Sequence, residues 1–268
     1  MRHGVALVAA LLTGLLAATP APAAPRIAII IDDLGYNRAA GEAVIALPAP
    51  VTCAVIPETP HGRRLGREAA EAGKEVMIHL PMATLDARAL DPGALHEGMS
   101  EAQIGAVLDR AQAVLPEARG LNNHMGSALT AEATPMGRLM DQLHHRHLFF
   151  VDSRTNAATL AERSARRAGL PAGRRDVFLD NSRELGHINE QFNRLLRLAR
   201  RRGQAIAIGH PYPETLDYLR QVLPLMEQAG VEVVPVSELL APPRGQVSSV
   251  DAVGRHAASA ATGRRTRP

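Results

Sequence analysis

The fold is decided by the stretch Arg26-Ile27-Ala28-Ile29-Ile30-Ile31-Asp32-Asp33-Leu34-Gly35. Its aliphatic, largely β-branched run is typical of a strand buried on both faces, and the run ends abruptly in two carboxylates and a glycine. Adjacent ionised carboxylates repel each other and are costly to desolvate, so such a pair usually binds a cation or shares a proton. For a single Asp the alternative is a turn that caps the next helix. The pair therefore favours a functional site at the end of this strand.

Strands and helices alternate along the rest of the chain. Apolar runs predict strands at 51–56, 75–78, 148–151, 176–179, 205–208 and 231–236, and residues 120–123 lead to a further strand end at 124. Capping residues and apolar periodicity predict helices at 37–47, 62–72, 100–115, 130–146, 157–168, 188–202 and 213–228. This alternation is typical of an α/β fold with parallel strands joined by right-handed crossovers.

Polar or ionisable side chains follow most of these strands. They are Asp32, Asp33, His79, His124, Asp152, Asp180 and His210. In a parallel barrel the active site is built at the carboxyl ends of several strands, which is where all seven stand. An open doubly wound sheet also alternates, but it gathers its ligands at one switch point. Because no Gly-rich phosphate fingerprint follows a strand, no nucleotide cofactor is expected.

Cys53 is the single cysteine of the chain, which excludes an intramolecular disulfide and a cysteine-based metal cluster. Its apolar surroundings predict a buried structural thiol. A bound metal would therefore be held by histidine and carboxylate, which suits a divalent ion such as zinc.

The two ends of the chain differ in composition from its middle. Residues 1–24 have a basic start, an apolar run and small residues near position 23, which predicts a secretory signal peptide and a periplasmic or secreted protein. An uncleaved signal that serves as an anchor is the alternative, although the apolar run is short for a membrane span. Residues 241–268 lack a periodic apolar face and predict a disordered basic tail.

The net charge of +3 is carried by the two ends of the chain. Arg2 contributes +1 and the tail +4, so residues 25–240 carry −2. Without a basic field, Trp or many aromatic residues, this part gives little support to nucleic-acid binding. After cleavage of the signal peptide, no stable membrane span is expected.

Six motifs in order make the chain similar to the divergent polysaccharide deacetylases, distant relatives of metal-dependent carbohydrate esterases. The motifs are Ile-Asp-Asp-Leu-Gly at 31–35, Met-Ile-His-Leu-Pro-Met at 77–82, Asn-Asn-His-Met-Gly-Ser at 122–127, Phe-Val-Asp-Ser-Arg-Thr at 150–155, Phe-Leu-Asp-Asn at 178–181 and Ala-Ile-Gly-His-Pro at 207–211. The resemblance covers about residues 26–240. It implies one catalytic domain at 25–240, a distorted (β/α) barrel of about seven strands, and one divalent metal, usually zinc.

The resemblance also implies a metal site. Asp32 resembles the general base of those esterases, and Asp33 resembles their metal carboxylate. His79 resembles the first histidine of their His-x-x-x-His motif, whereas position 83, where the second would stand, is Ala. At the next strand end, His124 is the candidate to complete an Asp-His-His triad with an open position for water and substrate.

Further roles follow from the same resemblance. His210 resembles the catalytic acid, and Asp152 the carboxylate that orients it. Asn123, Arg154 and Asp180 are expected to bind substrate. The Arg-x-Pro-Tyr segment of the active esterases is not visible in this sequence, but Arg154 is a candidate to stand near the base.

The sequence therefore predicts an exported metal-dependent hydrolase that removes acetyl groups from an N-acetylated cell-envelope glycan. Its partner would be an acetylated polysaccharide or a peptidoglycan fragment. The main rival is a non-catalytic periplasmic glycan-binding or regulatory protein on the same barrel. A glycoside hydrolase is a third reading, but it needs two acids on opposite sides of a sugar, and adjacent Asp32 and Asp33 suit a metal better.

Overall fold

The computed structural model describes residues 23–86 and 88–240 of the 268-residue chain. Apart from residues 23 and 24, the predicted signal peptide lies outside the described residues, as does the predicted tail at 241–268. Among the described residues, none of the helices has the length and apolar character needed to cross a membrane.

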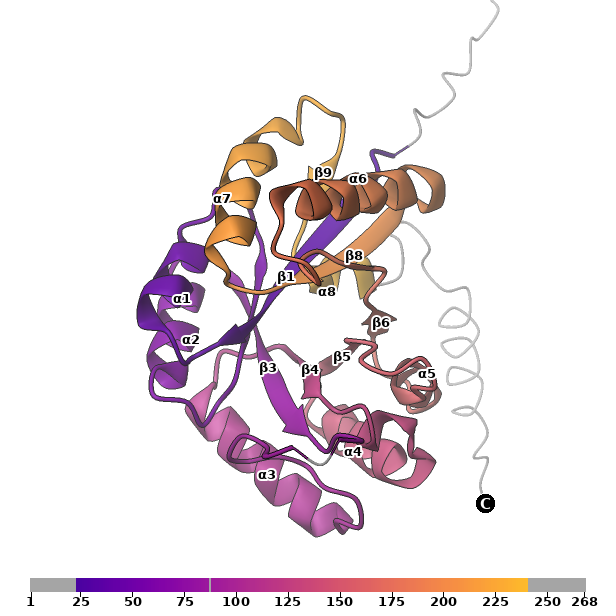
Figure 1. Ribbon diagram of the computed structural model, residues 1–268. Coiled ribbons are helices and arrows are strands. Elements are labelled where there is room, and N and C mark those ends of the chain that lie inside the picture. Colours follow the sequence, from indigo (N-terminus) through magenta and orange to yellow (C-terminus); the bar gives the residue numbers. More distant parts are fainter. Residues whose placement is uncertain (1–22, 87, 241–268) are drawn as a thin grey trace, which may run out of the picture.

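The described residues form one parallel sheet of nine strands that curls into a half-barrel (Figure 1). The strands are β1 Arg26–Leu34, β2 Thr52–Val55, β3 Glu75–Met82, β4 Gly120–Met125, β5 Phe149–Asp152, β6 Ala172–Arg174, β7 Val177–Phe178, β8 Gln204–Gly209 and β9 Glu232–Val233. Their order is β6-β5-β4-β3-β2-β1-β8-β7, and β9 pairs with β1. The predicted α/β fold with a distorted parallel barrel is confirmed.

The two outer strands of the sheet, β6 and β7, are almost consecutive in the chain. β6 pairs with β5, whereas β7 pairs with β8 on the other edge. Between them, the Arg175 amide donates to the Asp152 carbonyl at 2.9 Å, and the Asp176 amide donates to the Ile206 carbonyl at 2.9 Å. The polypeptide itself thus joins the two edges of the curled sheet.

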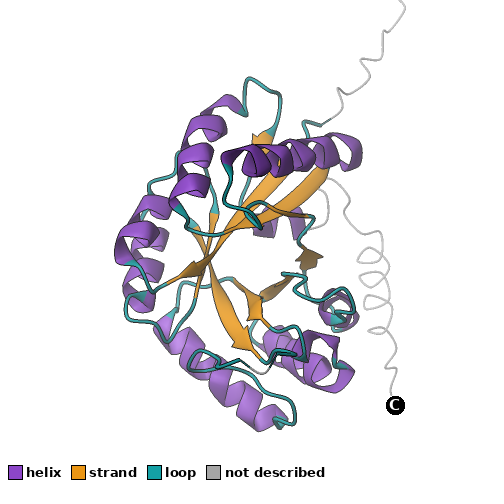
Figure 2. Cartoon of the chain, in the orientation of Figure 1, coloured by secondary structure: helices purple, strands orange, loops and turns teal. Residues whose placement is uncertain are grey.

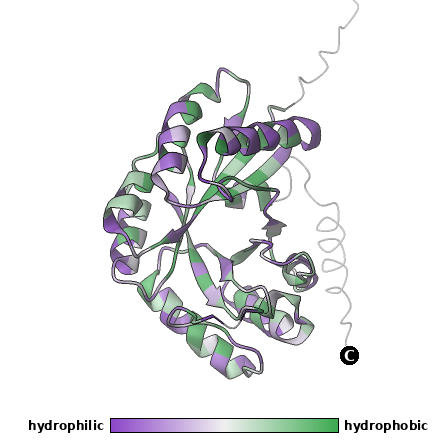
Figure 3. Cartoon of the chain, in the orientation of Figure 1, coloured by the Kyte–Doolittle hydropathy of each residue, from purple (hydrophilic) through white to green (hydrophobic). Residues whose placement is uncertain are grey.

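Helices cover the outer face of the sheet (Figure 2). They are α1 Arg38–Ile45, α2 Gly62–Glu71, α3 Glu101–Val114, α4 Ala133–His145, α5 Ala161–Arg167, α6 Leu185–Arg202 and α7 Pro213–Val222, with 3-10 turns at Leu129–Ala131 and Leu223–Leu225. The largest, α6, buries Phe192 and Leu195 against the sheet and shows a hydrophilic outer side above the apolar β8 (Figure 3). It ends at Gly203, whose φ of 82° is the left-handed conformation that glycine adopts without steric cost.

Several predicted elements have other bounds in the structure, among them the helix predicted at 213–228, which ends at Val222 and is followed by the 3-10 turn Leu223–Leu225. The strand predicted at 231–236 is shorter, because β9 ends at Val233 and helix α8, Val236–Leu240, begins three residues later. The helix predicted from Thr130 begins as a 3-10 turn before α4, and the helix predicted at 157–168 begins at Ala161. Strand β6 is too short for a hydrophobic period and was not predicted.

The first strand is buried on both faces, as its sequence predicts. Ile27, Ile29 and Ile31 pack in the outer core beneath the helices, whereas Ala28 and Ile30 face an inner cluster that includes Val236 and Leu239 of α8. The N-terminal ends of β1 and β8 are tied to α8, where the Arg26 guanidinium donates to the Glu238 carbonyl at 3.4 Å and the Gln204 amide to the Leu239 carbonyl at 3.0 Å. Helix α8 thereby covers this end of the barrel, and the polar residues collect at the opposite end.

Cys53 is fully buried in β2, which confirms the predicted structural thiol. Burial raises its pKa to about 12, although Lys74 opposes the shift. At pH 8 the folded protein should therefore react with a disulfide reagent about 1,000-fold more slowly than a thiol with the ordinary pKa of 9.0. A spectrophotometric thiol assay of native and denatured protein checks this, and equal rates in the two states would contradict the buried placement.

Candidate metal centre

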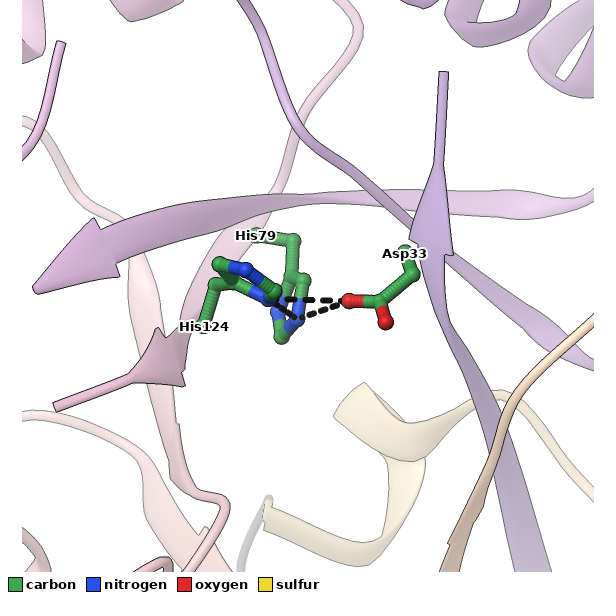
Figure 4. A group of neighbouring side chains, drawn as sticks. All are labelled: Asp33, His79 and His124. Atoms are coloured by element: carbon green, nitrogen blue, oxygen red, sulfur yellow. Dashed lines mark hydrogen bonds and ion pairs between the residues drawn. The ribbon is translucent and has the colours of Figure 1, made fainter. Parts of the chain in front are cut away.

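Asp33, His79 and His124 point toward one another at the carboxyl ends of β1, β3 and β4 (Figure 4). Asp33 Oδ1 lies 2.9 Å from His124 Nδ1 and 3.1 Å from His79 Nε2. The two histidine nitrogens lie 3.1 Å apart. The structure thus brings together the three residues expected to hold a metal, although β2 stands between β1 and β3 in the sheet.

A bulge in β1 lets both aspartates face this site. Successive side chains of a regular strand point to opposite faces, so two adjacent carboxylates would otherwise diverge. Between Ile31 and Leu34 the register with β2 shifts, since this interval pairs with the shorter interval Cys53 to Val55. Asp33 takes a φ of 60°, a left-handed conformation that Asp tolerates better than most residues. Asp32 stays buried, with Oδ2 lying 3.6 Å from His79 Nε2.

Asn122 connects the aspartate pair to the histidines. Its amide donates to Asp32 Oδ1 at 2.8 Å, and its carbonyl oxygen accepts from His79 Nδ1 at 2.7 Å. The sequence reasoning missed this residue. A signal was present, because Asn122 stands two positions before His124 and alternate residues of a strand share a face.

The hydrogen bonds fix which nitrogen of each histidine is free to bind a cation. The Asn122 oxygen can only accept, so His79 Nδ1 carries a proton and Nε2 faces Asp33. On His124 the outward nitrogen, Nε2, lies 3.1 Å from the carboxylate of Asp91, so it donates there and leaves Nδ1 toward the triad. Two imidazole nitrogens and one carboxylate oxygen therefore converge, which is a donor set typical of zinc.

The spacing of these donors also suits a metal. Tetrahedral zinc with bonds of about 2.05 Å holds neighbouring ligand atoms about 3.3 Å apart. The three separations among Asp33 Oδ1, His79 Nε2 and His124 Nδ1 are 2.9, 3.1 and 3.1 Å. The residues present therefore fit a divalent ion with three protein ligands.

The pKa values of His79 and Asp33 are shifted in the direction that favours a positive charge at this site. Burial by itself would lower the pKa of His79, but the carboxylates of Asp32 and Asp33 outweigh burial and raise this pKa to about 9. Burial opposes ionisation of Asp33, yet hydrogen bonds with His124 and His79 hold the pKa of Asp33 well below its usual range. Burial raises the pKa of Asp32, against the opposing effect of His79 and His210.

His210 lies across from the triad at the end of β8, and a buried carboxylate orients it. Its Nδ1 lies 2.9 Å from Asp180 Oδ1, and its own backbone amide donates to Asp180 Oδ2 at 2.7 Å. Thr215 donates to the same oxygen at 2.8 Å. Nε2 of His210 then points toward the site, 3.7 Å from Asp33 Oδ2. Burial lowers the pKa of His210, but Asp180 and Asp33 outweigh it, so the pKa is raised overall.

The contact between Asp180 and His210 corrects two predicted assignments. Asp180 was expected to bind substrate, but its carboxylate is fully covered and pairs with His210. Asp152 was expected to orient His210, but it uses its oxygens in the loop after β5. There it accepts from the Arg154 amide at 2.8 Å and the Thr159 hydroxyl at 3.0 Å.

Asn123 is also corrected, since both ends of its amide are occupied within the protein. Its oxygen accepts from the Ser153 amide at 2.9 Å, and its nitrogen donates to the Met125 carbonyl at 2.7 Å. The side chain is buried and joins the loops after β4 and β5. A role in shaping these loops replaces the predicted role in substrate binding.

Two arginines follow β5 and β6. Arg154 adopts a φ of 52°, and its charge lowers the pKa of Asp152 against the dominant effect of burial. Arg175, which the sequence reasoning missed, donates to the Ser153 carbonyl at 2.7 Å and lies over the Phe178 ring at 4.7 Å. Burial lowers the pKa of Arg175, and the charges of Asp152 and Asp32 oppose this shift.

Comparison with known proteins assigns the chain to a family. The chain is 40% identical over 210 residues to an uncharacterized protein of Haemophilus influenzae, covering 78% of this chain and 72% of that one. It is 39% identical over 235 residues to the uncharacterized protein YibQ of Escherichia coli K12, covering 88% and 73%. The crystal structure of an uncharacterized protein from Agrobacterium tumefaciens C58 superposes with a TM-score of 0.77 at 26% identity, covering 82% of this chain and 91% of that one. Residues 29–240 match the family profile described as divergent polysaccharide deacetylase, and the chain belongs to that family.

Proposed function

We propose that this protein is an exported, metal-dependent deacetylase that acts on an N-acetylated cell-envelope glycan. The observation that carries the proposal is the convergence of the Asp33, His79 and His124 donor atoms beside two further groups, Asp32 and His210. Amide hydrolysis needs an electrophilic centre, a base and an acid in one place, and these residues supply the types required.

Asp33, His79 and His124 would hold the ion. A divalent metal in this position polarises a carbonyl group and lowers the pKa of water. Asp32 would accept the proton of the attacking water, because it is the carboxylate beside the triad that the triad does not use. The amide of Asn122 fixes the orientation of Asp32 through Oδ1, which leaves Oδ2 on the side of His79.

His210 would donate a proton to the departing amine. Asp180 holds the imidazole through Nδ1 and turns Nε2 toward Asp33, so the proton on Nε2 faces the site. The raised pKa of His210 favours the protonated ring that a general acid needs. The aromatic rings of Phe178 and Tyr212 lie 5.2 and 5.5 Å from the imidazole and limit its movement.

The substrate class and the export step belong to the proposal as well. The family description supports an acetylated polysaccharide or peptidoglycan fragment as substrate. The pattern of residues 1–24 supports export to the periplasm or beyond. Zinc is the proposed metal because the donor set is two imidazoles and one carboxylate.

A second candidate function is glycan binding or regulation without turnover. It is favoured by Ala83, which stands where the related esterases have their second metal histidine and which is buried in the core. In the proposed site His124 of β4 would take its place, so the ligand set would depart from the esterase pattern. Metal and glycan binding without acetate release would select this second function.

Substitutions at the two aspartates test the proposed division of roles. Asp33→Ala should weaken zinc binding by more than about 100-fold, because it removes a ligand and the loss of an outer partner alone costs about 10–100-fold. Asp32→Ala should retain the zinc and lower acetate release by about 10²–10⁴-fold, the usual contribution of a general base. Elemental analysis of protein purified without chelator or histidine tag, and acetate assays on N-acetylglucosamine oligomers and peptidoglycan fragments, give the two readouts.

Asp217→Ala is the matched control, since Asp217 is an exposed aspartate on α7 that pairs with Arg220. It should leave both readouts unchanged. Equal zinc content in wild type and Asp33→Ala would refute the ligand assignment. A wild-type protein that holds zinc and binds glycans but releases no acetate would refute catalysis and leave the binding function.

The acid assignment is tested by Asp180→Asn. The amide cannot stabilise the imidazolium as the carboxylate does, so acetate release should fall by about 10²–10⁴-fold while zinc content stays at the wild-type level. Asp217→Asn, which removes a distant carboxylate of α7, should retain full activity. Unchanged turnover in Asp180→Asn would show that His210 does not act as the acid.

A further inference from the structure

We infer that Asp91 is a positioning residue that sets how His124 binds a metal. The inference rests on the metal site proposed above and extends it to a segment outside the six motifs of the sequence. Asp91 Oδ2 lies 3.1 Å from His124 Nε2, the ring nitrogen that faces away from Asp33 and His79. Tyr36 donates its hydroxyl to the other oxygen, Asp91 Oδ1.

The position of Asp91 is fixed by the backbone that follows it. Leu95 is buried and forms a parallel bridge with Met82 at the end of β3. The Leu95 amide donates to the Pro81 carbonyl and the Ala83 amide donates to the Leu95 carbonyl, both at 2.9 Å. Asp91 therefore returns to the carboxyl end of the sheet, beside β3 and β4.

The contact decides which tautomer His124 adopts. A neutral imidazole carries one proton, on Nδ1 or on Nε2, and the nitrogen without the proton is the one that binds metal. A carboxylate only accepts hydrogen bonds, so Asp91 requires the proton on Nε2. When a cation displaces the proton between Nδ1 and Asp33 Oδ1, which lie 2.9 Å apart, the lone pair of Nδ1 is the one that faces the ion.

The tautomer of His79 is also set by a hydrogen bond, but the partner is Asn122. Asn122 accepts from Nδ1 of His79 and so leaves Nε2 for the metal. The two histidines therefore present opposite ring nitrogens, because Asn122 acts on one and Asp91 on the other. Outer partners of this kind typically change metal affinity by about 10–100-fold when they are removed.

Tyr36 holds Asp91 in turn. It follows Asp33 by three residues, so the β1 end supplies both a ligand and the anchor of Asp91. A tyrosine hydroxyl keeps its proton at neutral pH, so Tyr36 can donate to the Asp91 carboxylate. With the Asp91 side chain 18% exposed and the His124 side chain 12% exposed, the chain of contacts lies at the partly covered rim of the site.

Zinc titration of the full chain tests the inference directly. Competition with a chromophoric chelator should show that Asp91→Ala binds zinc about 10–100-fold more weakly than wild type. Asp91→Asn should recover most of the affinity, because its side-chain oxygen still accepts from Nε2. Tyr36→Phe should lose less than Asp91→Ala. Asp86→Ala, which removes an exposed carboxylate paired with Arg88, is the control and should bind zinc as wild type does.

The tautomer gives a second readout that does not depend on affinity. Long-range proton–nitrogen NMR spectra of zinc-loaded wild type should show His124 protonated on Nε2, and Asp91→Asn should retain this pattern if Asp91→Ala fails to fold. Wild-type affinity in Asp91→Ala, or a His124 bound to zinc through Nε2, would overturn the inference and leave the metal site standing. A wild-type chain that does not bind zinc would overturn the metal site and the inference together.

Discussion

The site depends on the repulsion between two carboxylates at the end of a buried strand. Asp32 is buried and the side chain of Asp33 is 34% exposed, so water screens their charges less than it would on an open surface. Histidines on two other strands lie beside the carboxylates and offset this repulsion. The two carboxylates raise the pKa of His79 to about 9. The positive charge at His79 Nε2 lies where the donors of Asp33 and His124 converge. A divalent ion there would satisfy the same electrostatic demand and leave Asp32 free to act on substrate.

Local departures from regular secondary structure bring these charged side chains together. A bulge and a left-handed Asp33 aim both aspartates to one side of β1. Asn122 joins Asp32 to His79, and Asp180 fixes His210 from β8. At the other end of the barrel, α8 covers the inner cluster and keeps it apolar. The reactive groups are therefore gathered at one end of a rigid sheet, as the C-terminal ends of parallel strands favour.

The candidate metal ligands differ from the His-x-x-x-His pattern of the carbohydrate esterases that the sequence resembles. Position 83 holds a buried Ala, and the second candidate histidine, His124, comes from β4. His79 Nε2 and His124 Nδ1 nevertheless lie 3.1 Å apart, so the change of strand leaves a compact donor set. In the proposed site, Nε2 of His79 and Nδ1 of His124 would bind the metal, because their outer partners, Asn122 and Asp91, contact the other nitrogen of each ring.

The parallel α/β fold and the strand ends that carry Asp33, His79, His124 and His210 could be predicted from the sequence, because hydrophobic runs and the polar residues that end them are local patterns. Only the tertiary structure decided which groups pair. It placed Asp180 beside His210, used the side chains of Asp152 and Asn123 within loops, and brought Asp91 to His124. Pairing depends on register, on a bulge and on the return of a loop to the sheet. These set distances between residues remote in sequence, which no local pattern encodes.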